Sequence, residues 1–165
     1  MGTGATTTIL AGTTAIGAAL TAGVFFGFSW LVMPALDKMS QAGAITAMQE
    51  INRIAVRCAL MPLMFGTALL CLAAAIASLR AGRSVAAIGI AGALIYLIGV
   101  IGVTICANVP LNDQLARLSA TSAAPNAWHA YSTPWTQWNT VRAVAGAVAS
   151  GCFTTIVYLL GRATA

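Results

Sequence analysis

The sequence predicts an all-α membrane protein: a four-helix transmembrane bundle with short interfacial helices in its two long connections. Its 165 residues are 59% hydrophobic and only 7% charged, and the mean hydropathy of +0.89 lies far above that of a soluble domain. Four stretches come close to the roughly 20 apolar residues that cross a hydrocarbon core. The predicted spans are Thr8–Val32, Cys58–Leu79, Val85–Ala107 and Asn139–Leu160. We expect a single multi-pass domain over residues 1–165, in a bacterial inner or cell membrane.

The first span is expected to stay in the protein, because no basic region precedes it as in a cleavable signal peptide. It carries a stripe of small residues that lets another helix approach closely, namely Ala11, Ala15, Ala19, Gly23 and Gly27. Spans three and four offer similar positions, namely Gly89, Gly92, Gly99, Gly102, Gly146, Ser150 and Gly151. Such faces also allow a homo-oligomer. Pro62 is expected to kink or shorten the start of the second span.

The connections differ in length, and this predicts the topology. The short Arg80–Arg83 turn joins spans two and three, and its Gly82 can adopt the left-handed conformation. The two long connections must therefore share the opposite end of the bundle. The first contains an amphipathic helix with apolar positions at Ala44, Ile45, Met48, Ile51 and Ala55.

On the polar face of that helix, two interpretations remain open. Glu50 and Arg53 are three residues apart and form a solvated ion pair in the first. In the second, Asn52 and Arg53 turn over the mouth of the bundle. Basic residues also occur at both ends of the bundle, so their count does not decide which end is cytoplasmic.

The second long connection begins with Asn108-Val109-Pro110-Leu111-Asn112-Asp113. Pro110 is expected to break the third span, so that the Asn108 and Asn112 amides surround a helix end. Asp113 is expected to be solvated, to cap a helix or to pair with a nearby arginine, and a role as general base is the less favoured alternative.

The fourth helix is expected to begin at Thr133-Pro134, an N-cap followed by proline. Trp135, Trp138, Asn139 and Arg142 then share one face, which Tyr131 extends if the helix begins earlier. An aromatic belt with a snorkelling arginine is the alternative, but it does not explain Asn139. Arg142 offers five donors and keeps its charge, so we expect it to be paired or to bind an oxyanion.

Several classes of function are disfavoured. The four cysteines are scattered without Cys-x-x-Cys spacing, which indicates buried structural thiols and disfavours a thiol oxidoreductase. The net charge of +5 is spread over isolated residues, which disfavours nucleic-acid binding and suits weak attraction to anionic lipid. One histidine and three acids give little support to a protein-built metal site, and recruitment of an exogenous metal or haem stays open. A small transporter would need charged pathway residues that the spans lack.

Over almost its whole length the chain resembles the anthrone oxygenase family of small four-span membrane proteins. The motifs that carry the resemblance are Phe25-Phe26-Gly27-Phe28-Ser29, Val32-Met33-Pro34-Ala35-Leu36, Ala47-Met48-Gln49-Glu50-Ile51-Asn52-Arg53, Asn108-Val109-Pro110-Leu111-Asn112-Asp113 and Trp135-Thr136-Gln137-Trp138-Asn139-Thr140-Val141-Arg142. The last two are specific in combination.

The resemblance implies an oxidoreductase of the kind named from fungal polyketide pathways, a monooxygenase that converts a reduced tricyclic aromatic ketone to the quinone. Dioxygen would be the co-substrate, and no cofactor is specified. Asp113 or His129 would take the methylene proton. The enolate oxygen would be stabilised by Arg142, Asn108, Asn112 and Asn139. The flat rings would stack on Trp135, Trp138 and Tyr131, and Asn52 and Arg53 complete the expected binding residues.

One position departs from the family. Members often carry histidine directly after the tryptophan-asparagine pair, where this chain has Thr140, so a role of that histidine does not transfer. His129 lies in a polar segment, where a solvated loop histidine is the favoured interpretation. The competing class is a non-catalytic binding or structural membrane protein whose asparagines and arginine form an internal hydrogen-bonded clasp.

Overall fold

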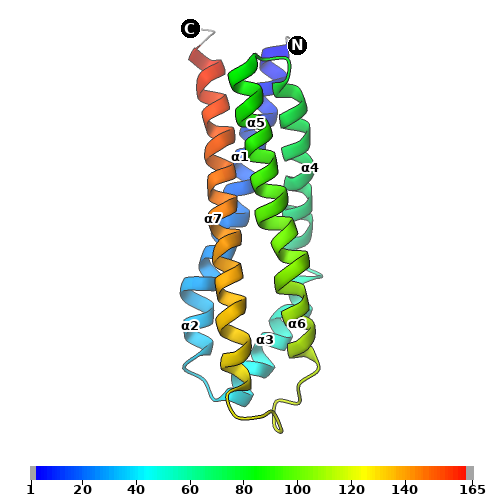
Figure 1. Cartoon of the computed structure of the whole chain (residues 1–165), viewed down its shortest axis with the longest axis vertical. Coiled ribbons are helices and arrows are strands. Elements are labelled where there is room, and N and C mark those ends of the chain that lie inside the picture. The colour runs from blue at the N-terminus through cyan, green and yellow to red at the C-terminus, as the bar shows by residue number, and fades with distance from the viewer. Residues whose placement is uncertain (1–2, 163–165) are drawn as a thin grey trace.

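The computed structural model describes residues 3–162, which are helical apart from short connections (Figure 1). The α-helices are α1 (Thr3–Gly27), α2 (Met33–Leu36), α3 (Gln41–Ala55), α4 (Leu60–Ser78), α5 (Arg83–Tyr96), α6 (Val109–Ala116) and α7 (Ala127–Arg162). Three π-helical segments interrupt them, η1 (Phe28–Val32), η2 (Leu97–Gly102) and η3 (Thr104–Asn108). Four continuous segments are long and apolar enough to cross a membrane, Gly4–Leu36, Leu60–Ser78, Arg83–Ala116 and Ala127–Arg162. The predicted all-α, four-span architecture is confirmed, and the chain is a multi-pass membrane protein.

The four segments form one long bundle with unlike ends (Figure 1). The start of α1, the end of α7 and the turn between α4 and α5 share one end, and Gly82 makes that turn with a φ of 104°. The other end carries α2, α3 and α6 beside the first part of α7. We call this second end the motif end, because it contains the asparagine motif and the beginning of the tryptophan motif.

The segments also differ in length. The α4 span has 19 residues, or about 28 Å at 1.5 Å per residue, close to the roughly 30 Å hydrocarbon core of a bilayer. The other three segments have 33, 34 and 36 residues, or roughly 50 Å each. They therefore extend past the end of α4 at the motif end. The predicted span limits at Val32, Ala107 and Asn139 fall inside these longer helices.

Two prolines, of which Pro110 was expected to break a helix, are accommodated by π-helical turns. The Met33 N–H donates to the Phe28 carbonyl just before Pro34, and the Val109 N–H donates to the Thr104 carbonyl just before Pro110. Proline removes a donor and crowds the carbonyl four residues earlier. One extra residue in the turn before it changes the register of these groups and lets the helix continue. The prediction that Pro110 breaks the third span is wrong.

The start of α7 also differs from the prediction. The helix begins at Ala127 and contains Pro134 in its interior, so Thr133 is not its N-cap. The Gln41 side chain, at the beginning of α3, accepts a bond from the Trp128 N–H at 3.4 Å and donates to the Ala124 carbonyl at 3.1 Å. This contact supplies a partner at the helix start that the local sequence lacks.

Two hydrophobic cores stabilise the bundle. The first joins α1, α4, α5 and α7 and is centred on side chains such as Phe25, Met64, Tyr96 and Phe153. The second is at the motif end and joins α2, α3, α6 and α7. The predicted apolar face of α3 contributes fully buried Ala44, Ile45 and Met48 to it. Gln49 of α3 donates to the Leu115 and Leu118 carbonyls at the end of α6, which ties α3 to the bundle.

Helices α1 and α7 pack closely along small residues. A Cβ added to Gly146 would lie 3.0 Å from the Ala22 Cβ and 3.4 Å from the Ala18 carbonyl oxygen. The buried face of α1 runs through Ala11, Ala15, Ala18 and Ala22. Ala19 and Gly23 are exposed, so the predicted stripe matches only at its beginning. It drifts off the contact because an exact four-residue repeat is longer than the helical period of 3.6.

We expect Gly146→Leu to destabilise the bundle by about 1–3 kcal/mol, because the larger side chain must displace α1 from α7. Gly151→Leu on the same helix is the matched control, since a Cβ there meets nothing within 4 Å. Thermal unfolding of the two variants in detergent measures the difference. Equal melting temperatures would show that α1 and α7 are not in close contact at Gly146.

Candidate functional site

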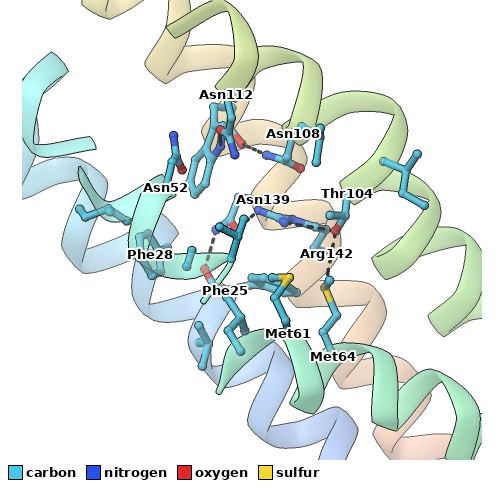
Figure 2. Close-up of a pocket in the computed structure, with 18 of the residues that line it drawn as sticks. Phe25, Phe28, Asn52, Met61, Met64, Thr104, Asn108, Asn112, Asn139 and Arg142 are labelled. Atoms are coloured by element: carbon cyan, nitrogen blue, oxygen red, sulfur yellow. Dashed lines mark hydrogen bonds between the residues drawn. The ribbon is translucent and has the colours of Figure 1, made fainter. Parts of the chain in front are cut away.

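A cavity of about 180 Å³ lies between the two cores, where α1, α3, α4 and α7 meet η3 and α6 (Figure 2). Most of its wall is apolar and includes Phe25, Phe28, Met61, Met64 and Trp135. Six polar side chains also reach it, namely Asn52, Thr104, Asn108, Asn112, Asn139 and Arg142. The polar residues are thus gathered in one apolar enclosure.

Arg142 is the only charged residue in the wall of this cavity. Its side chain is 6% exposed, with Nη2 donating to Asn139 Oδ1 at 2.7 Å and Nη1 donating to Thr104 Oγ1 at 3.2 Å. The guanidinium carbon lies 4.2 Å from the centre of the Phe25 ring and 5.6 Å from that of Trp135. Amide dipoles and ring faces therefore surround the cation.

No carboxylate compensates this charge among residues 3–162. The ion pair there joins Arg53 to Glu50 on the surface of α3, and Asp37 and Asp113 are also exposed. The solvated pair is thus the correct interpretation of the Glu50–Arg53 spacing. Burying an unpaired cation is costly, so the charge of Arg142 needs an explanation beyond packing.

Asn139 connects Arg142 to the first helix segment. Its Nδ2 donates to the Phe25 carbonyl at 2.6 Å and to Ser29 Oγ at 2.8 Å. Ser29 Oγ is in turn hydrogen-bonded to Thr140 Oγ1, at a distance of 2.9 Å. With Oδ1 accepting from Arg142, the fully buried amide fixes the position of the guanidinium.

Asn108 and Asn112 connect the third segment to α7. Asn112 Oδ1 accepts from Trp135 Nε1 at 2.8 Å and from the Tyr131 hydroxyl at 3.0 Å. Asn108 Nδ2 donates to the Trp135 carbonyl at 3.2 Å. Trp135 is thereby held on both its backbone and its ring, with one edge of the ring at the cavity.

Among residues 3–162, three buried polar atoms lack a hydrogen-bond partner: Arg142 Nε, Asn108 Oδ1 and Asn52 Nδ2. All three belong to residues that line the cavity. The Asn52 amide lies beside the Tyr131 hydroxyl. Buried polar groups without partners are rare and costly. Arg142 and Asn108 therefore each keep one buried polar atom without a protein partner beside the cavity.

Five of the residues expected at the site do not line the cavity. Asp113 is exposed on α6, and Arg53 is on the outer face of α3. His129 is exposed and lines a separate surface groove with Asp37 and Thr140. Trp138 is 44% exposed, as the alternative interpretation of an aromatic belt requires. Tyr131 is buried behind the wall and acts through Asn112.

Most of the apolar wall, including Phe25 and Met64, was missed, as was the polar Thr104, because such residues are ordinary in a membrane span. Thr104 had a usable signal, since it precedes Asn108 by four residues and is polar in an apolar stretch. Phe25 and Met64 offer none without the fold.

The described residues 3–162 contain no group of three or more His, Cys, Asp or Glu side chains arranged as metal ligands. All four cysteines are free. Cys71 is buried as expected, but Cys58 and Cys106 are exposed, so the prediction of buried thiols is wrong for these two. Neither is close enough to another cysteine to form a disulfide.

The fold and the site define a four-span membrane protein with a cavity toward one end of the bundle. The wall of this cavity is apolar except for six polar side chains. The family model for anthrone oxygenase matches residues 56–152, from the beginning of α4 through most of α7. The chain belongs to the anthrone oxygenase family. No curated protein and no solved structure matches it.

Proposed function

We propose that this protein binds a flat aromatic ketone or phenol in the cavity and catalyses its dioxygen-dependent oxidation to a quinone. Arg142 carries the proposal: a buried cation without a carboxylate, with Nε free, in the wall of an apolar cavity. A ligand that bears negative charge on oxygen would supply the missing counter-charge. The enolate of an anthrone and the anion of a phenol are such ligands.

In this reaction the substrate methylene loses a proton, and its electron pair moves to the ketone oxygen to give an enolate. The same carbon then donates an electron pair to dioxygen, and protonation of the distal oxygen gives a hydroperoxide. Loss of the second methylene proton with cleavage of the O–O bond releases water and leaves a carbonyl. One CH₂ group and one O₂ thus become one C=O group and one water.

Arg142 would favour the enolate by placing a positive charge at its oxygen, which lowers the pKa of the bound methylene. The cavity wall contains neither carboxylate nor imidazole. We therefore assign the proton to water rather than to Asp113 or His129. Phe25, Phe28 and Trp135 line the cavity and would contact the rings of a flat substrate.

The second candidate is the non-catalytic clasp. It is favoured by Asn139 and Asn112, whose side chains form hydrogen bonds to other groups of the protein. A clasp explains these bonds, but it does not explain why Arg142 Nε and Asn108 Oδ1 are left without partners.

The test is dioxygen uptake by the purified protein in lipid nanodiscs, with a panel of anthrones and hydroquinones. We expect uptake faster than the uncatalysed autoxidation measured with empty nanodiscs. For an anthrone, we expect one quinone formed per dioxygen consumed. If the rates match autoxidation across the whole panel, the oxygenase proposal fails for these substrates and the clasp becomes the better explanation.

A further inference from the structure

An apolar groove continues the cavity toward the outside of the bundle. Its volume is about 570 Å³, and it lies where the end of α3 meets α1 and the beginning of α4. Groove and cavity share five lining residues, namely Val24, Phe28, Ile51, Ala55 and Leu60. The two spaces therefore lie next to each other.

The groove differs from the cavity in its chemistry. The residues that line only the groove are Ile54, Cys58, Ala59 and Leu63. Apart from the Cys58 thiol, its side chains are aliphatic or aromatic, whereas six polar side chains reach the cavity. The groove therefore suits a hydrocarbon segment, and the cavity suits the oxygen-bearing part of the same molecule.

The position of the groove along the bundle suits contact with lipid. It lies at the first turns of α4, the segment whose length matches the hydrocarbon core, and thus near one edge of that core. Ile54 is 60% exposed and Val24 is 36% exposed at its rim. An opening with such a rim communicates with lipid chains more readily than with water.

Size points in the same direction. Pockets for small molecules usually measure about 300–1,000 Å³, whereas the cavity has about 180 Å³. The cavity alone is thus small for a ligand of that class. The rest of a larger ligand would lie in the groove.

We propose that the ligand is an amphiphile that enters from the bilayer, with an oxygen-bearing ring at Arg142 and an apolar tail in the groove. This inference rests on the proposed function, because the ring is the group that the cavity is proposed to bind. It goes further in naming the ligand class, a tailed phenol or quinol, and the lateral route of entry.

The experiment compares tritiated 2-methylhydroquinone with 2-decylhydroquinone, bound without oxygen to the protein in nanodiscs. Ligand concentration is expressed as moles of ligand per mole of lipid, because the decyl compound dissolves in the bilayer. Moving its tail from lipid into the groove adds little binding free energy. We expect the two dissociation constants to agree within about threefold in the wild type, since lipid chains are as apolar as the groove. Leu63→Trp fills the groove and should weaken only the decyl compound, by about tenfold or more.

Leu69→Trp is the matched control, because Leu69 is 69% exposed on the same helix and lies outside the groove. It should leave both compounds unaffected. If the Leu63→Trp variant still binds the methyl compound, it is folded. If it is not folded, Ala59→Trp, which also fills the groove, is used for the same test. If the decyl compound does not bind the wild type, or binds the groove variants normally, the inference about the groove is wrong. The proposed binding of phenols in the cavity would not be affected by either result. If neither compound binds the wild type, the proposed binding of phenols fails too.

Discussion

Arg142→Gln is expected to lower kcat/KM for an anthrone by about 100-fold or more, the usual effect of removing a preorganised group that stabilises a developing oxyanion. Glutamine keeps a donor within the cluster but removes the positive charge. The free energy of unfolding should change by less than about 2 kcal/mol, because relief from burying a cation offsets the bonds lost to Asn139 and Thr104. Dioxygen uptake and thermal unfolding of the same preparation measure the two effects.

Arg162→Gln is the control, since Arg162 is exposed at the opposite end and donates to the Tyr158 hydroxyl within its own helix. It should leave both activity and stability unchanged. The clasp makes the opposite prediction for Arg142→Gln, namely a large loss of stability as the main effect. Unchanged activity in that variant would exclude Arg142 from the reaction.

Asn112→Leu is expected to destabilise the motif end, because Trp135 Nε1 and the Tyr131 hydroxyl lose their common acceptor. Both rings are buried, and each donor left without an acceptor costs about 1–3 kcal/mol. Asn112→Asp keeps an acceptor oxygen and should retain more of the stability. Chemical denaturation followed by tryptophan fluorescence measures the change.

The neighbouring residue provides the control for this variant. Asp113 is exposed and forms no ion pair among residues 3–162, so Asp113→Asn should unfold like the wild type and retain activity. A strong loss of activity with Asp113→Asn would restore this carboxylate as the proton acceptor. Equal stability of Asn112→Leu and the wild type would mean that Trp135 is held by other contacts.

The helical class and the four spans could be predicted because the length of an apolar stretch is a direct physical requirement of the bilayer. The predicted limits at Val32, Ala107 and Asn139 were wrong, because the helices continue past them at the motif end. Pro34, Pro110 and Pro134 are strong local signals for a break, but π-helical turns accommodate the first two and α7 continues through the third. Tertiary packing of the motif end supports backbone that the local sequence disfavours.

The candidate site was predictable where polarity is unusual. Asn108, Asn139 and Arg142 lie next to apolar sequence, so a polar side chain there needs a partner, and the structure brings all three to one cavity. Asp113 and His129 are equally polar, but they lie where water is available, so their presence carries no such requirement. Contacts such as that of Phe25 with Arg142 depend on helix packing, which the sequence pattern does not specify.

The π-helical turns before Pro34 and Pro110 act as angular offsets. One additional residue rotates everything that follows by about 100° relative to an uninterrupted α-helix. In the first segment, the part before η1 can therefore keep the orientation that its small residues need for packing on α7. The motif end is turned independently, so that Asn108 and Asn112 face α7. The packing of the bundle and the orientation of the site are thus set by different parts of one continuous helix. A substitution that changes the packing of one part need not change the orientation of the other.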